Sequence, residues 1–206
     1  MTLTELCNEV AGLTIRPDLV ATTIKSQVKA ATLRAHARVD YWRDLEQDQI
    51  TFASSAYIQQ LPVSGLPRFK KFSYVRIWDP SGLDPLTQAQ TGAPGLFFDI
   101  LNDPNQVLND YKLEKPRVVY AAAGNLNFRS NTTFKYVLLG WFRGPIISPE
   151  VNYRSWIAEE FPYAIIFDAA RAVMKTIGWD EQSRAYDGFI TEQYSIIDAA
   201  NVDIRG

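Results

Sequence analysis

Apolar residues recur at helical spacing through the first 45 residues. A short helix is predicted to begin after Thr2, because the Thr2 hydroxyl and the Glu5 carboxylate can each accept the other residue's backbone amide, and to end at Gly12. A second helix is predicted from Pro17 to about Leu45, because its apolar residues recur every three or four positions. These residues are Val20, Ile24, Val28, Ala31, Ala35, Val39 and Trp42.

The pattern changes to alternation in the middle of the chain. Ile50 and Phe52 alternate with polar neighbours from Gln49 onward, as a half-buried strand requires. The pair Gly124-Asn125 predicts a tight hairpin, and Asn131-Thr132 a further turn, so we expect an antiparallel meander. The other strands are predicted at residues 69–78, 96–101, 117–123, 126–129 and 134–142, with an exposed proline- and glycine-rich excursion at 79–94.

Helical spacing returns after Pro145. Ser148 is expected to cap a helix with Pro149 in its first turn, an apolar helix follows from Tyr163 to Ile177, and Gly178 ends it. A last helix is predicted from Asp180. The sequence therefore predicts an α+β fold, in which a helical bundle built from N- and C-terminal helices carries an inserted antiparallel β-sheet block. We expect one domain at 1–206, with helices at 1–46 and 146–204 and the β region at 47–145.

Composition narrows the chemistry. The chain has 21 Lys and Arg against 23 Asp and Glu, so its net charge is -2. This balance argues against a protein whose main role is to bind nucleic acid. One Cys and one His exclude an internal disulfide and a metal site built from several of these residues. The N-terminus does not resemble a signal peptide and no stretch is apolar enough to cross a bilayer, so we expect synthesis in a reducing cytoplasm.

Each candidate catalytic group has a structural interpretation that we favour. His36 lies beside the apolar stripe of the long predicted helix, where a partly exposed structural role is expected, and Cys7 is expected to be a small buried apolar residue. Asp168 has a helical partner in Arg171, three residues later. The remaining carboxylates that could support glycoside hydrolysis are Asp99, Glu159 and Glu160, of which the last two point about 100° apart on a helix.

Two binding surfaces remain as alternatives. Basic residues alternate with aromatic ones between 68 and 78, which is a pattern found on single-strand nucleic-acid platforms but also on any strand with a basic outer face. The basic residues are Arg68, Lys70, Lys71 and Arg76, and the aromatic ones are Phe69, Phe72, Tyr74 and Trp78. A carbohydrate-binding or hydrolysing tail component is the second hypothesis, motivated by Trp78, Trp141, Trp156 and the scattered carboxylates.

Three segments of the chain carry a resemblance to a known family. They are Thr2–Leu45, Asp103–Pro145 and Tyr153–Val202. Together they resemble head-to-tail adaptor proteins of tailed bacteriophages. The most specific part is the last one, where Trp156 is followed by EEFPYAI, an apolar helix, Gly178 and a charged helix. The resemblance covers most of the chain, although the excursion at 79–94 has no counterpart in it.

The resemblance implies a structural protein of the virion and no enzyme, with no cofactor and no metal. Such adaptors form a ring beneath the portal protein, usually twelve-fold, which extends the DNA channel and gives the tail its attachment platform. The implied partners are the portal, tail proteins of the nozzle, hub or tube, other copies of the chain, and double-stranded DNA that passes through without sequence recognition. No membrane is involved, and the implied location is the neck between capsid and tail, after synthesis in the host cytoplasm. Aromatic residues make up 13% of the chain, and such residues are enriched at protein interfaces.

The resemblance also suggests where contacts lie. The C-terminal segment of these adaptors commonly reaches the portal, and Lys25 and Lys29, close together on the long helix, are possible inter-subunit contacts to an acidic neighbour. The expected portal-binding residues are Tyr194, Ile197, Asn201, Val202, Asp203, Ile204 and Arg205.

Overall fold

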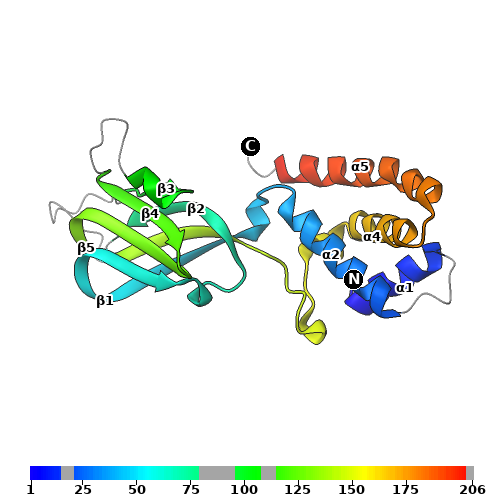
Figure 1. Cartoon of the computed structure of the whole chain (residues 1–206), viewed down its shortest axis with the longest axis horizontal. Coiled ribbons are helices and arrows are strands. Elements are labelled where there is room, and N and C mark those ends of the chain that lie inside the picture. The colour runs from blue at the N-terminus through cyan, green and yellow to red at the C-terminus, as the bar shows by residue number, and fades with distance from the viewer. Residues whose placement is uncertain (15–20, 79–95, 108–114, 203–206) are drawn as a thin grey trace. The chain divides into compact units, whose positions relative to one another are not determined.

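The computed structural model describes residues 1–14, 21–78, 96–107 and 115–202, drawn as ribbon in Figure 1. It confirms the α+β class. The chain divides into two compact units, which we call the helical unit (Met1–Arg43 with Gly144–Gly206) and the sheet unit (Asp44–Arg143). The expectation of one domain with the sheet inserted at 47–145 stays a prediction. The excursion at 79–94 lies outside the described residues.

The helical unit joins the two ends of the chain. Buried residues from both ends, such as Leu6, Val28, Ile165 and Ile197, belong to one apolar core. The N-terminal ammonium also donates a hydrogen bond of 3.0 Å to the carbonyl oxygen of Ala158. Figure 1 shows α5 lying along α4. The helices are α1 (Leu3–Thr14), α2 (Ala21–Ala37), α3 (Trp156–Glu160), α4 (Pro162–Thr176) and α5 (Asp180–Val202).

The capping signals in α1 and α4 are confirmed. The Thr2 amide donates to the Glu5 carboxylate at 2.8 Å, and the Glu5 amide donates to the Thr2 hydroxyl at 3.3 Å. Gly178 ends α4 with a φ of 80°, a conformation that glycine adopts without strain. The expected end of α1 at Gly12 is wrong, because the helix continues to Thr14.

Two other helix boundaries differ from the prediction. The second helix ends at Ala37 instead of about Leu45, because Tyr41 is fully buried in the helical core and Leu45 already pairs with Phe142 as a strand residue. Ser148 caps no helix. Ser155 is the cap, since its hydroxyl accepts the Ala158 amide at the start of α3.

One long central strand organises the sheet unit. This strand, β5 (Asn125–Arg143), pairs antiparallel with β1 (Leu45–Pro62), β2 (Phe69–Ile77) and β4 (Arg117–Ala122). The turn predicted at Asn131-Thr132 is wrong, because β5 continues through it while its pairing changes from β4, up to Ser130, to β2, from Val137. The sheet is mixed and not a purely antiparallel meander, since β3 (Asp99–Leu101) runs parallel to β4.

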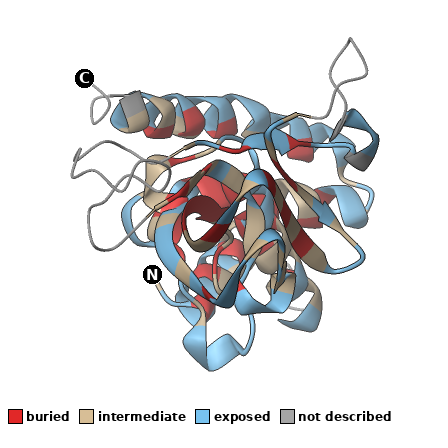
Figure 2. Ribbon diagram, turned by 90° about the vertical axis from the view of Figure 1, so that its left-hand side faces the viewer, coloured by how far each residue is buried: buried red, intermediate tan, exposed pale blue. Residues whose placement is uncertain are grey.

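The hairpin between β4 and β5 lies one residue earlier than predicted. Ala122 pairs with Asn125, so the two loop residues are Ala123 and Gly124, with φ values of 51° and 75°. In the core of this unit, the Phe128 ring lies 5.8 Å from Phe52 between centroids. Figure 2 shows buried residues along the strands of the sheet unit, interrupted by intermediate and exposed ones.

Candidate functional site

His36 is buried, with 2% of its surface exposed, so the expectation of partial exposure is wrong. Its Nε2 lies 2.9 Å from the hydroxyl oxygen of Ser155, the same hydroxyl that caps α3. The Trp156 ring meets His36 edge-on at 5.8 Å between centroids. The fold thus brings His36 together with a serine that lies 119 residues away in the chain. Both side chains are enclosed, so this pair ties α2 to α3 and offers no nucleophile to a substrate.

The other candidate catalytic residues are separate from one another, and Glu159 and Glu160 form ion pairs with different arginines. Glu159 lies 3.8 Å from Arg154, whereas Glu160 pairs with Arg43, so the two adjacent carboxylates serve different arginines. Asp99 is an exposed residue of β3 in the sheet unit. Burial raises the pKa of the half-buried Cys7 thiol, which disfavours the reactive thiolate.

Asp168 is the centre of a charged cluster within the helical unit. The carboxyl group is nearly enclosed, and its Oδ1 accepts from Nη2 of Arg171 at 2.8 Å, which confirms the predicted helical pair. Its Oδ2 accepts from Nε of Arg34 in α2 at 2.8 Å. Arg171 reaches further, since its Nη1 donates to Asp187 of α5 at 3.0 Å. The cluster therefore links α2, α4 and α5.

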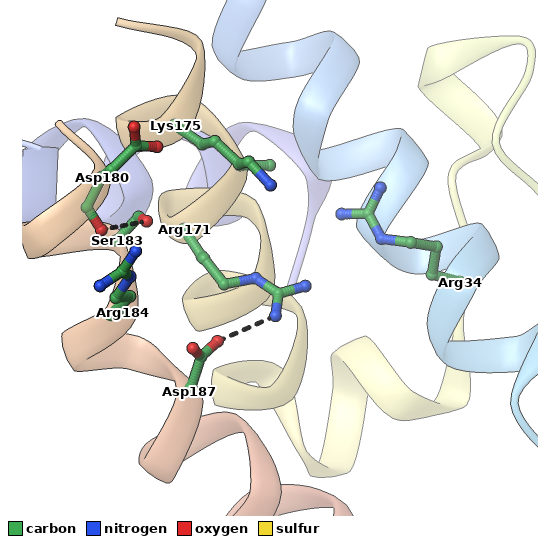
Figure 3. A pocket seen from close by; sticks show the side chains of 8 residues that line it. Arg34, Arg171, Lys175, Asp180, Ser183, Arg184 and Asp187 are labelled. Carbon is green, nitrogen blue, oxygen red and sulfur yellow. Dashed lines mark hydrogen bonds and ion pairs between the residues drawn. The ribbon is translucent and has the colours of Figure 1, made fainter. Parts of the chain in front are cut away.

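A pocket of about 650 Å³ opens beside this cluster (Figure 3). Arg34 projects from α2 toward Arg171 and Lys175 of α4, and Arg184 and Asp187 line the side formed by α5. This pocket was not predicted from the sequence. The signal that could have indicated it is the i, i+4 spacing of Arg171 and Lys175, which places two cations on one face of α4.

A smaller pocket of about 210 Å³ adjoins it and reaches Tyr194. Burial raises the pKa of the Tyr194 hydroxyl to about 12, and the nearby Asp168 carboxylate adds to the effect. The guanidinium of Arg38 lies over the Tyr194 ring, 4.3 Å from its centroid, and Arg38 also pairs with Asp198 at 3.2 Å.

The expected portal-binding residues fall into three groups. Tyr194 and Ile197 belong to the core of the helical unit, with 7% and 0% of their surfaces exposed, so both side chains are used by the chain's own fold. Asn201 accepts a hydrogen bond of 3.4 Å from the Trp42 amide and is half-buried. Val202 is the last residue of α5. Asp203, Ile204 and Arg205 lie outside the described residues.

Lys25 and Lys29 contact an acidic residue of their own chain. Their ammonium groups each lie 2.8 Å from a different carboxylate oxygen of Glu150. These hydrogen bonds lower the pKa of Glu150 from 4.5 to about 2. The acidic neighbour expected for the two lysines is thus found within the helical unit.

Neither aromatic platform forms as the sequence alternatives require. Phe69 and Phe72 pack against the sheet core, with ring centroids 5.0 Å apart, instead of standing free for base stacking. Trp141 is buried in that core, and Trp156 belongs to the other unit. Trp141 and Trp156 therefore do not join Trp78 on one exposed face of the described part of the sheet unit.

A different aromatic group reaches the surface of the helical unit. Phe167 of α4 packs against Tyr163, Tyr186 and Phe189, with centroid distances of 5.6, 6.0 and 5.4 Å. Tyr163 and Phe189 are half-exposed, at 50% and 51%. Large apolar side chains exposed together are typical of surfaces that contact other proteins.

Within the described part of the chain, no group of His, Cys, Asp and Glu side chains is arranged to hold a metal ion. None of the helices there has the length and apolar character to span a membrane.

No protein-family model matches the chain, and no curated protein matches it significantly. Among solved structures, it is similar to a chain from the neck of an empty GTA particle computed with C6 symmetry. The identity is 11% and the TM-score is 0.27, and the match covers 80% of this chain and 75% of that one.

Proposed function

We propose that this chain is a non-enzymatic structural subunit of the neck of a tailed phage particle. Copies of it form a ring adaptor between the portal and the tail, extend the DNA channel and provide the platform on which the tail attaches. DNA passes through this ring without being read. The proposal starts from the resemblance of three sequence segments to head-to-tail adaptors.

One structural observation supports it most. The two outer segments that carry the resemblance, Thr2–Leu45 and Tyr153–Val202, meet almost entirely within one helical unit with a common core. This shared core agrees with the expectation that the N- and C-terminal helices build one bundle. The exposed aromatic group around Phe167 gives this unit a surface suited to protein contacts.

The fate of the candidate catalytic groups agrees with a structural role. His36 is enclosed and bonded to Ser155, and Asp168 is shared between two arginines. Groups held in this way stabilise a fold and have no access to substrate. The alternative, a carbohydrate-binding or hydrolysing tail component, has no such supporting observation.

Portal docking is proposed at the very end of the chain. Tyr194 and Ile197 are core residues, and Asn201 bonds to Trp42. The residues that we propose to contact the portal are therefore Val202, Asp203, Ile204 and Arg205. A variant that lacks Asp203–Gly206 should melt at the same temperature as the full chain but lose portal binding. Retained portal affinity would contradict this part of the proposal.

The proposed function is tested in the phage that encodes the chain. An amber mutation in its gene should yield heads that contain DNA but carry no tail, as seen by electron microscopy. Tailed particles that fail only to adsorb to or penetrate the host would instead support the carbohydrate alternative.

A further inference from the structure

The pocket between α2, α4 and α5 has more cationic than anionic side chains. Four basic residues line it, namely Arg34, Arg171, Lys175 and Arg184, whereas two carboxylates, Asp180 and Asp187, do so (Figure 3). A third carboxylate, that of the buried Asp168, pairs with two of these lining residues, Arg34 and Arg171. An excess of positive charge therefore remains.

The four cationic side chains differ in whether they form ion pairs within the chain. Arg34 and Arg171 share the two oxygens of Asp168, so their positions are fixed by a buried carboxylate. Lys175 and Arg184 are exposed, and neither has an ion-pair partner among the described residues. The pocket thus combines two positioned guanidinium groups with two free cations on α4 and α5.

The pocket already shows which ligand chemistry fits. The carboxylate of Asp187 lies 3.0 Å from Nη1 of Arg171 at the edge of the pocket, and the Asp187 side chain is 56% exposed. A guanidinium presents donors in a planar fork that matches a carboxylate, and an exposed ion pair of this kind is easily exchanged. The volume of about 650 Å³ lies within the range of roughly 300–1,000 Å³ typical of ligand pockets.

We infer that this pocket binds carboxylate side chains of an acidic peptide segment on a partner protein. Arg171 and Arg34 position one carboxylate, and Lys175 and Arg184 bind a second. The inference goes beyond the proposed neck function and stands without it, since it depends only on the helical unit.

Charge favours a peptide over a nucleic acid as the occupant. Asp180 and Asp187 interrupt the cationic lining, whereas a phosphate backbone needs a continuous cationic track to bind along. Acidic side chains of a peptide are separated and flexible, so each can reach one cation and avoid these two carboxylates.

The test uses the full chain and a fluorescently labelled oligoglutamate peptide in anisotropy titrations at low salt. We expect saturable binding, and a loss of about tenfold in affinity for the double variant Lys175→Glu and Arg184→Glu, because two attractions become repulsions. The control is Arg154→Glu on the same unit, since Arg154 is 78% exposed and lies outside the pocket lining. It is compared with the single variants Lys175→Glu and Arg184→Glu, each of which makes the same change in charge, and each of these should lose more affinity than the control. This control should change affinity by less than about twofold.

Other outcomes contradict the inference. An absence of oligoglutamate binding, or an equal loss from Arg154→Glu, would reject the pocket as the binding site. Tighter binding of oligothymidylate of equal length, lost in the same double variant, would assign the pocket to phosphates and reject the peptide. Circular dichroism melts of each variant confirm that the fold is retained, and Lys175→Gln with Arg184→Gln provides a milder second variant.

Discussion

Arg34 of α2 and Asp168 of α4 form a hydrogen bond of 2.8 Å between Nε and Oδ2, although they lie 134 residues apart in the chain. Asp168 is almost fully enclosed, and its other oxygen is taken by Arg171. A buried carboxylate needs such partners, because removing it from water is costly. This pair therefore fastens together helices that precede and follow the sheet unit in the sequence.

Replacing Asp168 should destabilise the helical unit. Asp168→Asn keeps the shape but removes the charge that two arginines share, and we expect a loss of about 2 kcal/mol in the free energy of unfolding. The loss is smaller than for a fully buried ion pair, because both arginines are partly solvated. Urea denaturation measures it. Asp187→Asn, at an exposed position, is the control and should cost less than about 0.5 kcal/mol; equal losses would contradict the central role of Asp168.

His36→Ala should lower stability without affecting assembly. The substitution leaves a cavity beside Trp156 and deprives Ser155 of a partner, so we expect a loss of about 2–3 kcal/mol. Cys7→Ala, at a half-buried position, should cost about 1 kcal/mol or less. Thermal melts and portal-binding assays test both. A folded His36→Ala protein that fails to assemble would indicate a functional role for the imidazole.

The bridge between Glu150 and the two lysines predicts a pH dependence. The pKa of Glu150 is lowered from 4.5 to about 2, so its contribution to stability is fully present above pH 4.5 and is lost as the pH falls toward about 2. In Glu150→Gln, the melting temperature should therefore fall less steeply between these pH values than in the parent chain. Identical slopes would mean that the bridge does not form in solution.

Local signals in the sequence were sufficient for some features of the fold. The reciprocal cap of Thr2 and Glu5 and the glycine end of α4 at Gly178 depend on neighbouring residues only, and both were predicted correctly. The end of α2 and the course of β5 were not. Tyr41 is buried in a core that includes residues from the far end of the sequence, and β5 continues as one strand because successive partner strands pair with it. These contacts join residues far apart in the sequence.

The same distinction holds for the candidate site. The Asp168–Arg171 pair could be predicted from helical spacing, whereas Arg34 joins it only through the packing of α2 against α4. The spacing of Lys25 and Lys29 predicts that both contact one acidic group. The sequence does not indicate that this group is Glu150, because it lies more than a hundred residues away.

Gly140 should not tolerate a side chain. Gly140 of β5 pairs with Tyr74 of β2, and a Cβ at this position would lie 2.6 Å from Cζ of the Tyr74 ring. Gly140→Ala should therefore displace the ring and cost about 2 kcal/mol in urea denaturation. In the Tyr74→Ala background the same change should be nearly neutral, because the clash is gone. Additive losses in the double variant would place the constraint elsewhere.

The adaptor role is tested most directly by mass photometry of the purified chain with and without the portal protein of the same phage. The chain alone should stay far smaller than a ring, and mixing should add about twelve copies of 23.3 kDa to each portal. A portal whose mass does not change, with the chain remaining at the mass of one copy, would contradict the adaptor role.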